Sequence, residues 1–136
     1  MMPFKLLTAL YTMVSLSKAA AAAISLTVGE ATYTVDLADT PAARELAARL
    51  PLSLHMADLN ANEKYGDLEE PLPTQAEAVG SIRAGDLMLF TPTCLVLFYK
   101  DFRTPYRYTR VGRVRGAASL PAALGRGSVQ IHLRPL

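Results

Sequence analysis

Two short stretches of the sequence carry the residue types of a binding site. The first contains Asn60, Asn62, Glu63, Lys64 and Tyr65. Its amides and charged groups offer hydrogen bonds and charge, and its tyrosine offers an apolar or stacking wall. The same asparagines are also typical of loops that satisfy their own backbone, so a structural loop is the alternative interpretation.

The second stretch places aromatic residues beside an arginine, at Tyr99, Phe102, Tyr106, Tyr108 and Arg110. Rings next to a guanidinium favour a groove for a peptide or an anionic ligand. The alternative is a strand face packed on its neighbours, with Arg110 paired to an acid. From the two stretches together we predict a binding site made of Asn60, Asn62, Glu63, Lys64, Tyr65, Tyr99, Tyr106 and Arg110.

Catalytic chemistry has little support in the sequence. His55 and His132 stand alone on strand-like segments, without a second histidine at metal-ligand spacing. There is no glycine-rich phosphate loop and no nucleophile elbow. Cys94 lies in an apolar strand pattern, where we expect it to be buried as a small hydrophobic residue. We therefore predict no catalytic residue, no metal site and no cofactor.

Composition indicates one globular domain. The chain has 136 residues, of which 51% are hydrophobic and 19% are charged. A net charge of +2 gives no support for nucleic-acid binding. The charges are nevertheless divided along the chain, because residues 24–101 hold 12 acids and 5 bases while residues 102–136 hold 7 arginines and no acid. Such a division favours either an anion-binding surface or pairing between the two parts within the fold.

The first 23 residues have the parts of a secretory signal peptide. A lysine at position 5 precedes an apolar run over residues 6–16, and five alanines end the segment. The run is too short for a permanent membrane span. We therefore predict a signal peptide over residues 1–23, a folded domain over residues 24–136, and export to the periplasm or the exterior. A cytoplasmic protein with an N-terminal extension is the alternative.

Strand patterns dominate the remaining sequence. Alternating β-branched and apolar residues predict strands at residues 24–28, 32–37, 52–59, 65–68, 87–90, 94–99, 106–114 and 128–134. Thr40 and Pro41 predict the start of a helix that ends before Pro51. Ser119 is the expected cap of a second short helix over residues 119–124. This many strands with two helices predict a closed or nearly closed barrel, since closure removes exposed edges.

Several motifs, taken in order, resemble the small bacterial and archaeal cyclophilin-like proteins. They include Met56-Ala57-Asp58-Leu59-Asn60, Gly85-Asp86-Leu87-Met88-Leu89 and Tyr106-Arg107-Tyr108-Thr109-Arg110. The resemblance covers nearly all of residues 24–133. It implies a mainly β fold, namely a closed cyclophilin-like β-barrel of about eight strands with two short helices.

The same resemblance leaves the activity open, because folds host many functions. Cyclophilins proper isomerise prolyl bonds with an arginine on the strand after the first helix and with a tryptophan at the proline pocket. Here that strand contains no arginine, and the chain has no tryptophan. We therefore expect a binding module for a small molecule or an extended peptide, and the alternative is a peptidyl-prolyl isomerase with an atypical site. Some relatives are joined to flavodoxin-like domains, so the resemblance implies a redox partner of the flavodoxin-like kind.

Overall fold

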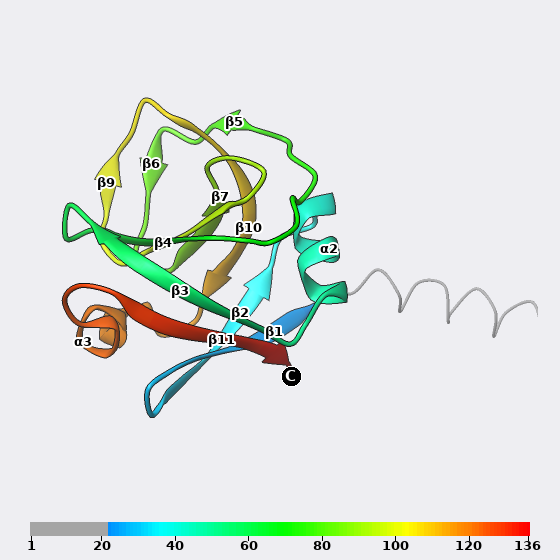
Figure 1. Cartoon of the computed structure of the whole chain (residues 1–136). Helices are drawn as coiled ribbons and strands as arrows, with labels where there is room; N and C mark the ends of the chain where they lie inside the picture. The colour runs from blue at the N-terminus through cyan, green and yellow to red at the C-terminus, as the bar shows by residue number, and fades with distance from the viewer. Residues whose placement is uncertain (1–21) are drawn as a thin grey trace, which may run out of the picture.

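The computed structural model describes residues 22–136 (Figure 1). The predicted leader, residues 1–23, lies outside the described residues apart from its last two alanines. Strand β1 begins at Ala23, and the carbonyl of Ala22 accepts a hydrogen bond from the Leu37 amide at 2.9 Å. The sheet thus starts one residue before the expected domain boundary. No helix within residues 22–136 has the length and hydropathy needed to cross a membrane.

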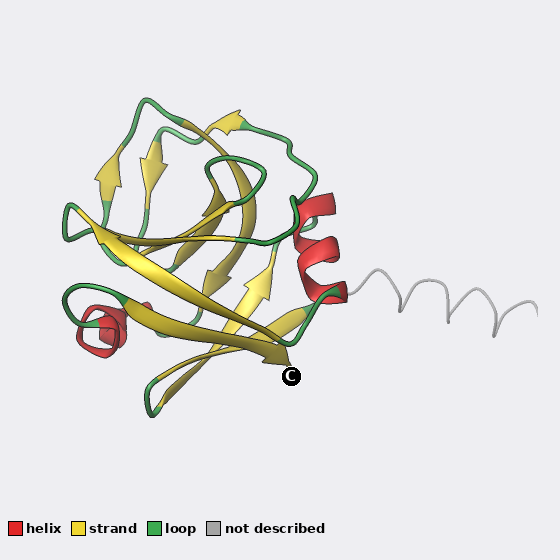
Figure 2. Cartoon of the chain, viewed as in Figure 1, coloured by secondary structure: helices red, strands yellow, loops and turns green. Residues whose placement is uncertain are grey.

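Eight antiparallel strands form a closed barrel, which confirms the predicted fold class. Neighbouring strands pair in the order β2-β1-β11-β3-β4-β8-β7-β10, and β10 also pairs with β2, which closes the ring. Figure 2 shows the strands wrapping around one interior. Their bounds are β1 Ala23–Val28, β2 Ala31–Leu37, β3 Leu52–Leu59, β4 Glu63–Asp67, β7 Asp86–Leu89, β8 Cys94–Phe98, β10 Arg107–Val114 and β11 Val129–Pro135.

Two short helices lie at opposite ends of the barrel (Figure 1). Helix α2, Pro41–Ala48, begins where the Thr40 hydroxyl accepts the Ala43 amide at 3.2 Å, as predicted. Helix α3, Leu120–Leu124, follows the 3-10 turn η1, Ala117–Ser119. The expected cap Ser119 makes no capping hydrogen bond, and its hydroxyl lies 2.9 Å from the Tyr33 hydroxyl and 3.4 Å from the Gly116 carbonyl oxygen.

A second apolar layer covers one outer face of the barrel. The inward residues of the strands form the main core with the buried side chains of both helices. A separate cluster lies on the outer face of β7, β8 and β10 and consists of Ile82, Met88, Val96, Phe98 and Tyr108. The strands β6, Ser81–Ile82, and β9, Phe102–Arg103, pair with each other beside it, and β5, Glu77–Ala78, pairs with β10. This part of the barrel wall is therefore buried on both faces.

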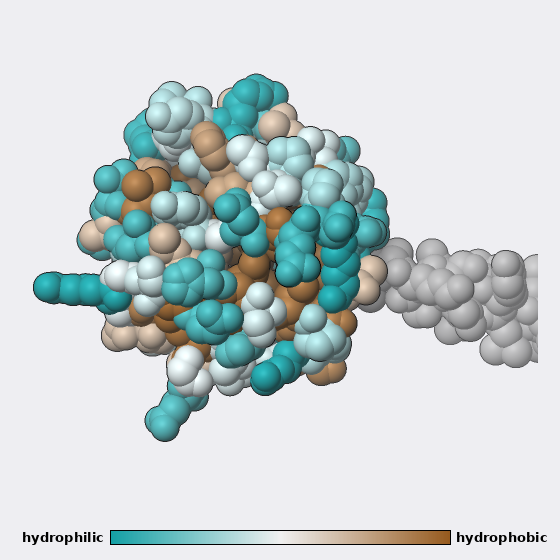
Figure 3. Space-filling view, viewed as in Figure 1, coloured by the Kyte–Doolittle hydropathy of each residue, from teal (hydrophilic) through white to brown (hydrophobic). Residues whose placement is uncertain are grey.

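The divided charges of the chain are partly paired across the barrel. Arg110, Arg113 and Arg115 make ion pairs with Glu77, Asp86 and Asp36, at 3.0, 2.7 and 2.7 Å. Because these arginines come from the basic part and the carboxylates from the acidic part, barrel closure brings opposite charges together. Figure 3 shows hydrophilic side chains projecting around hydrophobic patches on one face of the molecule.

Candidate functional site

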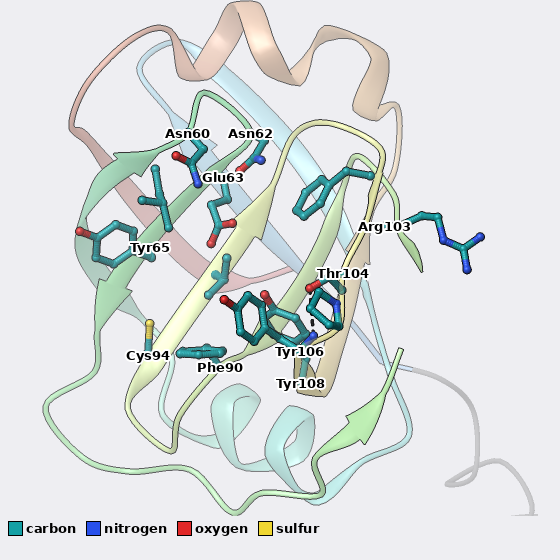
Figure 4. Close-up of a pocket in the computed structure, with 14 residues that line it drawn as sticks. Asn60, Asn62, Glu63, Tyr65, Phe90, Cys94, Arg103, Thr104, Tyr106 and Tyr108 are labelled. Atoms are coloured by element: carbon teal, nitrogen blue, oxygen red, sulfur yellow. Dashed lines mark hydrogen bonds between the residues drawn. The ribbon is translucent and has the colours of Figure 1, made fainter. Parts of the chain in front are cut away.

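A groove of about 560 Å³ opens on the outer face of the barrel, beside the second apolar layer. Its floor comes from β4 and β8, and its two sides come from the β3–β4 turn and the segment that links β9 to β10 (Figure 4). This volume is within the range of small-molecule sites. The groove is lined by Leu59, Asn60, Asn62, Glu63, Tyr65, Phe90, Cys94, Val96, Phe102, Arg103, Thr104, Pro105, Tyr106 and Tyr108.

The exposed hydrophobic side chains of the described chain gather at this groove. Five large hydrophobic residues within residues 22–136 are exposed to solvent. Four of them line the groove, and the fifth, Leu136, lies elsewhere. Tyr106 is the most exposed of the four, at 59%. A concave site bordered by exposed apolar groups is typical of ligand or partner binding, whereas single exposed hydrophobic residues need no such explanation. The four are Leu59, Tyr65, Phe90 and Tyr106.

The β3–β4 turn sets one side of the groove. Asn60 and Ala61 both have left-handed backbone angles, with φ of 56° and 53°, and the Asn62 amide donates to the Leu59 carbonyl at 3.2 Å. These are the features of a type I′ hairpin turn. The Asp58 carboxylate supports the turn by accepting the Ala61 amide at 3.1 Å. The turn therefore sets where β4 begins, and with it the direction of the Glu63 and Tyr65 side chains.

Aromatic rings in contact with one another form the opposite side. Phe90 meets Tyr106 edge to face at 5.8 Å between ring centroids, and Tyr108 meets Phe98 edge to face at 5.4 Å. Phe98 also lies 5.7 Å from Phe102. Such ring pairs add to the free energy of burial and hold the wall in place. Phe90, Phe102, Tyr106 and Tyr108 thus present ring surface to the groove, and the buried Phe98 packs behind them.

Acidic groups dominate the electrostatics of the groove. The Glu63 pKa is raised, first by burial and then by the charge of Asp58. Burial also raises the pKa of the Cys94 thiol, and the charges of Asp67 and Glu63 add to the effect. Cys94 is half-buried at the groove rather than buried in the core as expected. A thiol with a raised pKa is a poor nucleophile, so the groove shows no activated cysteine.

Lys64 and Tyr99, two of the predicted site residues, lie inside the barrel wall and away from the groove. Lys64 is fully buried, and its Nζ donates to Asp58 Oδ1 at 3.0 Å and to the carbonyls of Gly125 and Gly127 at 2.8 and 2.6 Å. The Tyr99 hydroxyl donates to the same Asp58 oxygen at 2.5 Å. Burial and the hydrogen bond to Asp58 raise the Tyr99 pKa to about 12. These groups fasten the α3–β11 loop to the barrel.

Arg110 also lies apart from the groove, on the outer face of β10 toward β5. Its guanidinium donates from Nε to Glu77 Oε1 at 3.0 Å, which is the paired arrangement considered as the alternative. The structure thus brings Asn60, Asn62, Glu63, Tyr65 and Tyr106 together and places Lys64, Tyr99 and Arg110 elsewhere. Within residues 22–136, no group of three or more histidine, cysteine, aspartate or glutamate side chains is arranged to hold a metal ion.

Sequence reasoning missed several residues of the groove. Leu59 and Phe90 each end a predicted strand, and Val96 is an outward residue of an apolar strand. Apolar residues at strand ends carry little signal by themselves, because they are common in cores as well as at surfaces. The strand order β4-β8-β7-β10 brings the two stretches to one face of the barrel, with β8 and its Val96 lying beside β4.

The comparisons with known proteins agree with this fold. A family model described as the Cyclophilin-like family matches residues 26–134. The solution structure of a hypothetical protein from Archaeoglobus fulgidus aligns with a TM-score of 0.57 at 15% sequence identity, covering 85% of this chain and 95% of that one. At that identity the likeness shows a shared fold alone. No curated protein matches the chain.

Proposed function

The chain belongs to the cyclophilin-like family, and because a fold does not by itself determine an activity, we propose a function from the site: the outer groove binds a small molecule or an extended peptide without catalysis. One observation carries the proposal, namely that four of the five exposed large hydrophobic residues of the described chain surround one groove of about 560 Å³. Burying apolar side chains is favourable, so a ligand that covers these four residues would gain binding free energy from their burial.

The groove also supports an extended ligand. It lies on the outer face of the barrel between the β3–β4 turn and the Thr104–Tyr108 segment, so a chain can enter without threading through the barrel. Tyr106, at 59% exposure, is the side chain with the most surface to lose on binding. Aromatic residues of this kind provide a large part of the free energy at binding sites.

The binding site is tested by following backbone amide signals of the full chain during titration with a library of small molecules and short peptides. We expect the responding amides to cluster at the β3–β4 turn, β4 and the Thr104–Tyr108 segment, and Tyr106→Ala to weaken binding about tenfold. Arg110→Ala, an exposed residue of the same strand region that lies outside the groove, is the matched control and should leave affinity unchanged. Responses confined to any other surface would overturn the proposal.

The alternative function, peptidyl-prolyl isomerisation, is tested by an activity assay on the full chain. Strand β3, which follows α2, carries His55 on its exposed side and no arginine. A proline-peptide isomerisation assay at high protein concentration should give the rate of buffer alone. A rate enhancement that Tyr106→Ala removes would establish catalysis in the groove and replace the binding-only proposal.

We also propose export, on the evidence of the leader sequence. The expected result is a mature N-terminus at Ile24 in the periplasmic or external fraction, read by N-terminal sequencing. Full-length protein starting at Met1 in the cytoplasm would contradict it.

A further inference from the structure

Two hydrogen-bond acceptors at the groove, the Glu63 carboxyl and Asn62 Oδ1, are withdrawn from water and lack partners within residues 22–136. The Glu63 carboxyl makes no hydrogen bond or ion pair within residues 22–136, although it is half-buried. Asn62 Oδ1, at the neighbouring position, is buried, and no donor in the described chain reaches it. A buried acceptor without a donor costs free energy, which a ligand that brings N–H groups would offset.

Aromatic rings surround the same space. Figure 4 shows Glu63 reaching from β4 into the groove, on the side toward Tyr106 and Tyr108. Phe90 and Phe102 complete this side of the lining. Ring faces are negative and attract cations, and a carboxylate together with several rings is the combination that holds ammonium groups in proteins.

The charges near the groove are mostly negative. Asp67 ends β4, one of the floor strands, and Asp58 lies on the neighbouring strand β3. Burial first, and then charges that include that of Glu63, raise the pKa of Tyr108 and of Cys94, whose ionised forms would be anions. Arg103 is the basic residue among those that line the groove. Its guanidinium extends away from the space in which Glu63 lies (Figure 4). An entering cation therefore meets the Glu63 carboxylate and aromatic rings.

Building on the proposed function, we propose that the groove selects a cationic organic group, a protonated amine or a guanidinium, which donates to the Glu63 carboxylate while its apolar neighbour packs on Tyr106, Tyr108 and Phe90. The two unpartnered acceptors require a ligand with N–H donors, and the Glu63 carboxylate favours a ligand with a positive charge. The aromatic rings pack against the apolar part of the ligand. A free amine and a lysine or arginine side chain of an extended peptide share this chemistry.

The test compares three probes of similar size, namely benzylammonium, benzyl alcohol and benzoate. Each is titrated into the full chain at pH 7.5, and its affinity is measured from the backbone amide signals. We expect benzylammonium to bind about tenfold more tightly than benzyl alcohol, from a charge-assisted hydrogen bond and cation–π contact. Benzoate should be the weakest. Glu63→Gln should remove the preference while benzyl alcohol binds as before. Glu30→Gln removes a carboxylate from the exposed β1–β2 turn, outside the groove, and should leave the affinities for all three probes unchanged.

The outcomes separate the two proposals. Equal or tighter binding of benzyl alcohol or benzoate in the groove would overturn the cation preference and leave the binding function standing. Absence of any groove response to all probes and to lysine-containing peptides would overturn both. If benzylammonium is preferred, acetylated tripeptides with a central lysine or norleucine then distinguish the sources: a preference for lysine favours a peptide, and equal weak binding favours a free amine.

Discussion

Glu63 and Lys64 are adjacent residues of β4 with opposite surroundings. The Lys64 ammonium is buried with a carboxylate and two carbonyls as partners, whereas the Glu63 carboxyl lies in the groove and has none in the described chain. We call the first set, made of Lys64, Asp58 and Tyr99, the inner cluster. Because alternate residues of a strand face opposite sides, one step along β4 separates a group that stabilises the fold from one available to a ligand. The two faces should therefore respond differently to substitution.

The largest expected effect is on the inner cluster. Lys64→Met removes a buried charge with three hydrogen bonds, and we expect the free energy of unfolding to fall by about 3 kcal/mol. Urea denaturation of the full chain measures the loss. Lys100→Met, at an exposed lysine, is the control and should change stability by less than about 0.5 kcal/mol. If the two variants were equally stable, the inner cluster would have no structural role.

A smaller effect is expected at the tyrosine of the inner cluster. Tyr99→Phe deletes one hydroxyl donor and should lower the free energy of unfolding by about 1 kcal/mol at neutral pH. Tyr65→Phe, on the groove side, is the control, since the Tyr65 hydroxyl has no partner within residues 22–136. Equal losses in both variants would contradict the distinction between the two faces.

The hydrogen bonds of Asp58 with Tyr99 and Lys64 also make the free energy of unfolding depend on pH, in a direction that the pKa of Asp58 determines. Hydrogen bonds from Tyr99, then from Lys64, lower the pKa of Asp58 below the ordinary 3.8. A lowered pKa means that Asp58 stabilises the fold above pH 3.8 and that this contribution is lost as the pH falls through the folded-state value. Asp58→Asn should flatten this acid limb in denaturation curves taken from pH 5 downward. An unchanged acid limb would show that other carboxyls determine it.

At Glu63 the sign reverses and the effect is smaller. Its raised pKa means that folding favours the protonated form, so the contribution of this group is present below pH 4.5 and is lost as the pH rises through the folded-state pKa. Glu63→Gln should therefore stabilise the chain at pH 7, by less than about 1 kcal/mol, and the difference should close at low pH. Glu30→Gln is again the control. A destabilised Glu63→Gln protein would place Glu63 with the structural residues.

These two residues also explain what the sequence could and could not predict. Strand alternation gave the barrel, and β3 was predicted with its observed bounds, because its pattern is long and bordered by Pro51 and a turn. Strand β4 was predicted at residues 65–68 but runs over Glu63–Asp67. That offset left Glu63 and Lys64 in a loop, where inward and outward positions are undefined. A loop at these positions predicts one site for both, although adjacent residues of a strand face opposite sides of the sheet.

The smallest expected effect uses Cys94 as a reporter of the groove. Burial and then the charges of Asp67 and Glu63 raise its thiol pKa, so alkylation by iodoacetamide at pH 8 should be slower in the folded chain than in urea. Glu63→Gln removes one of the charges that oppose thiolate formation and should increase the folded-state rate slightly, while Glu30→Gln should not. Benzylammonium should slow the reaction in the unsubstituted protein by covering the thiol. If Glu63→Gln leaves the alkylation rate unchanged while the ligand still protects Cys94, the thiol lies in the groove but the Glu63 charge does not affect its pKa. The charge of Glu63 would then act on the Tyr108 side of the groove and not on the Cys94 side.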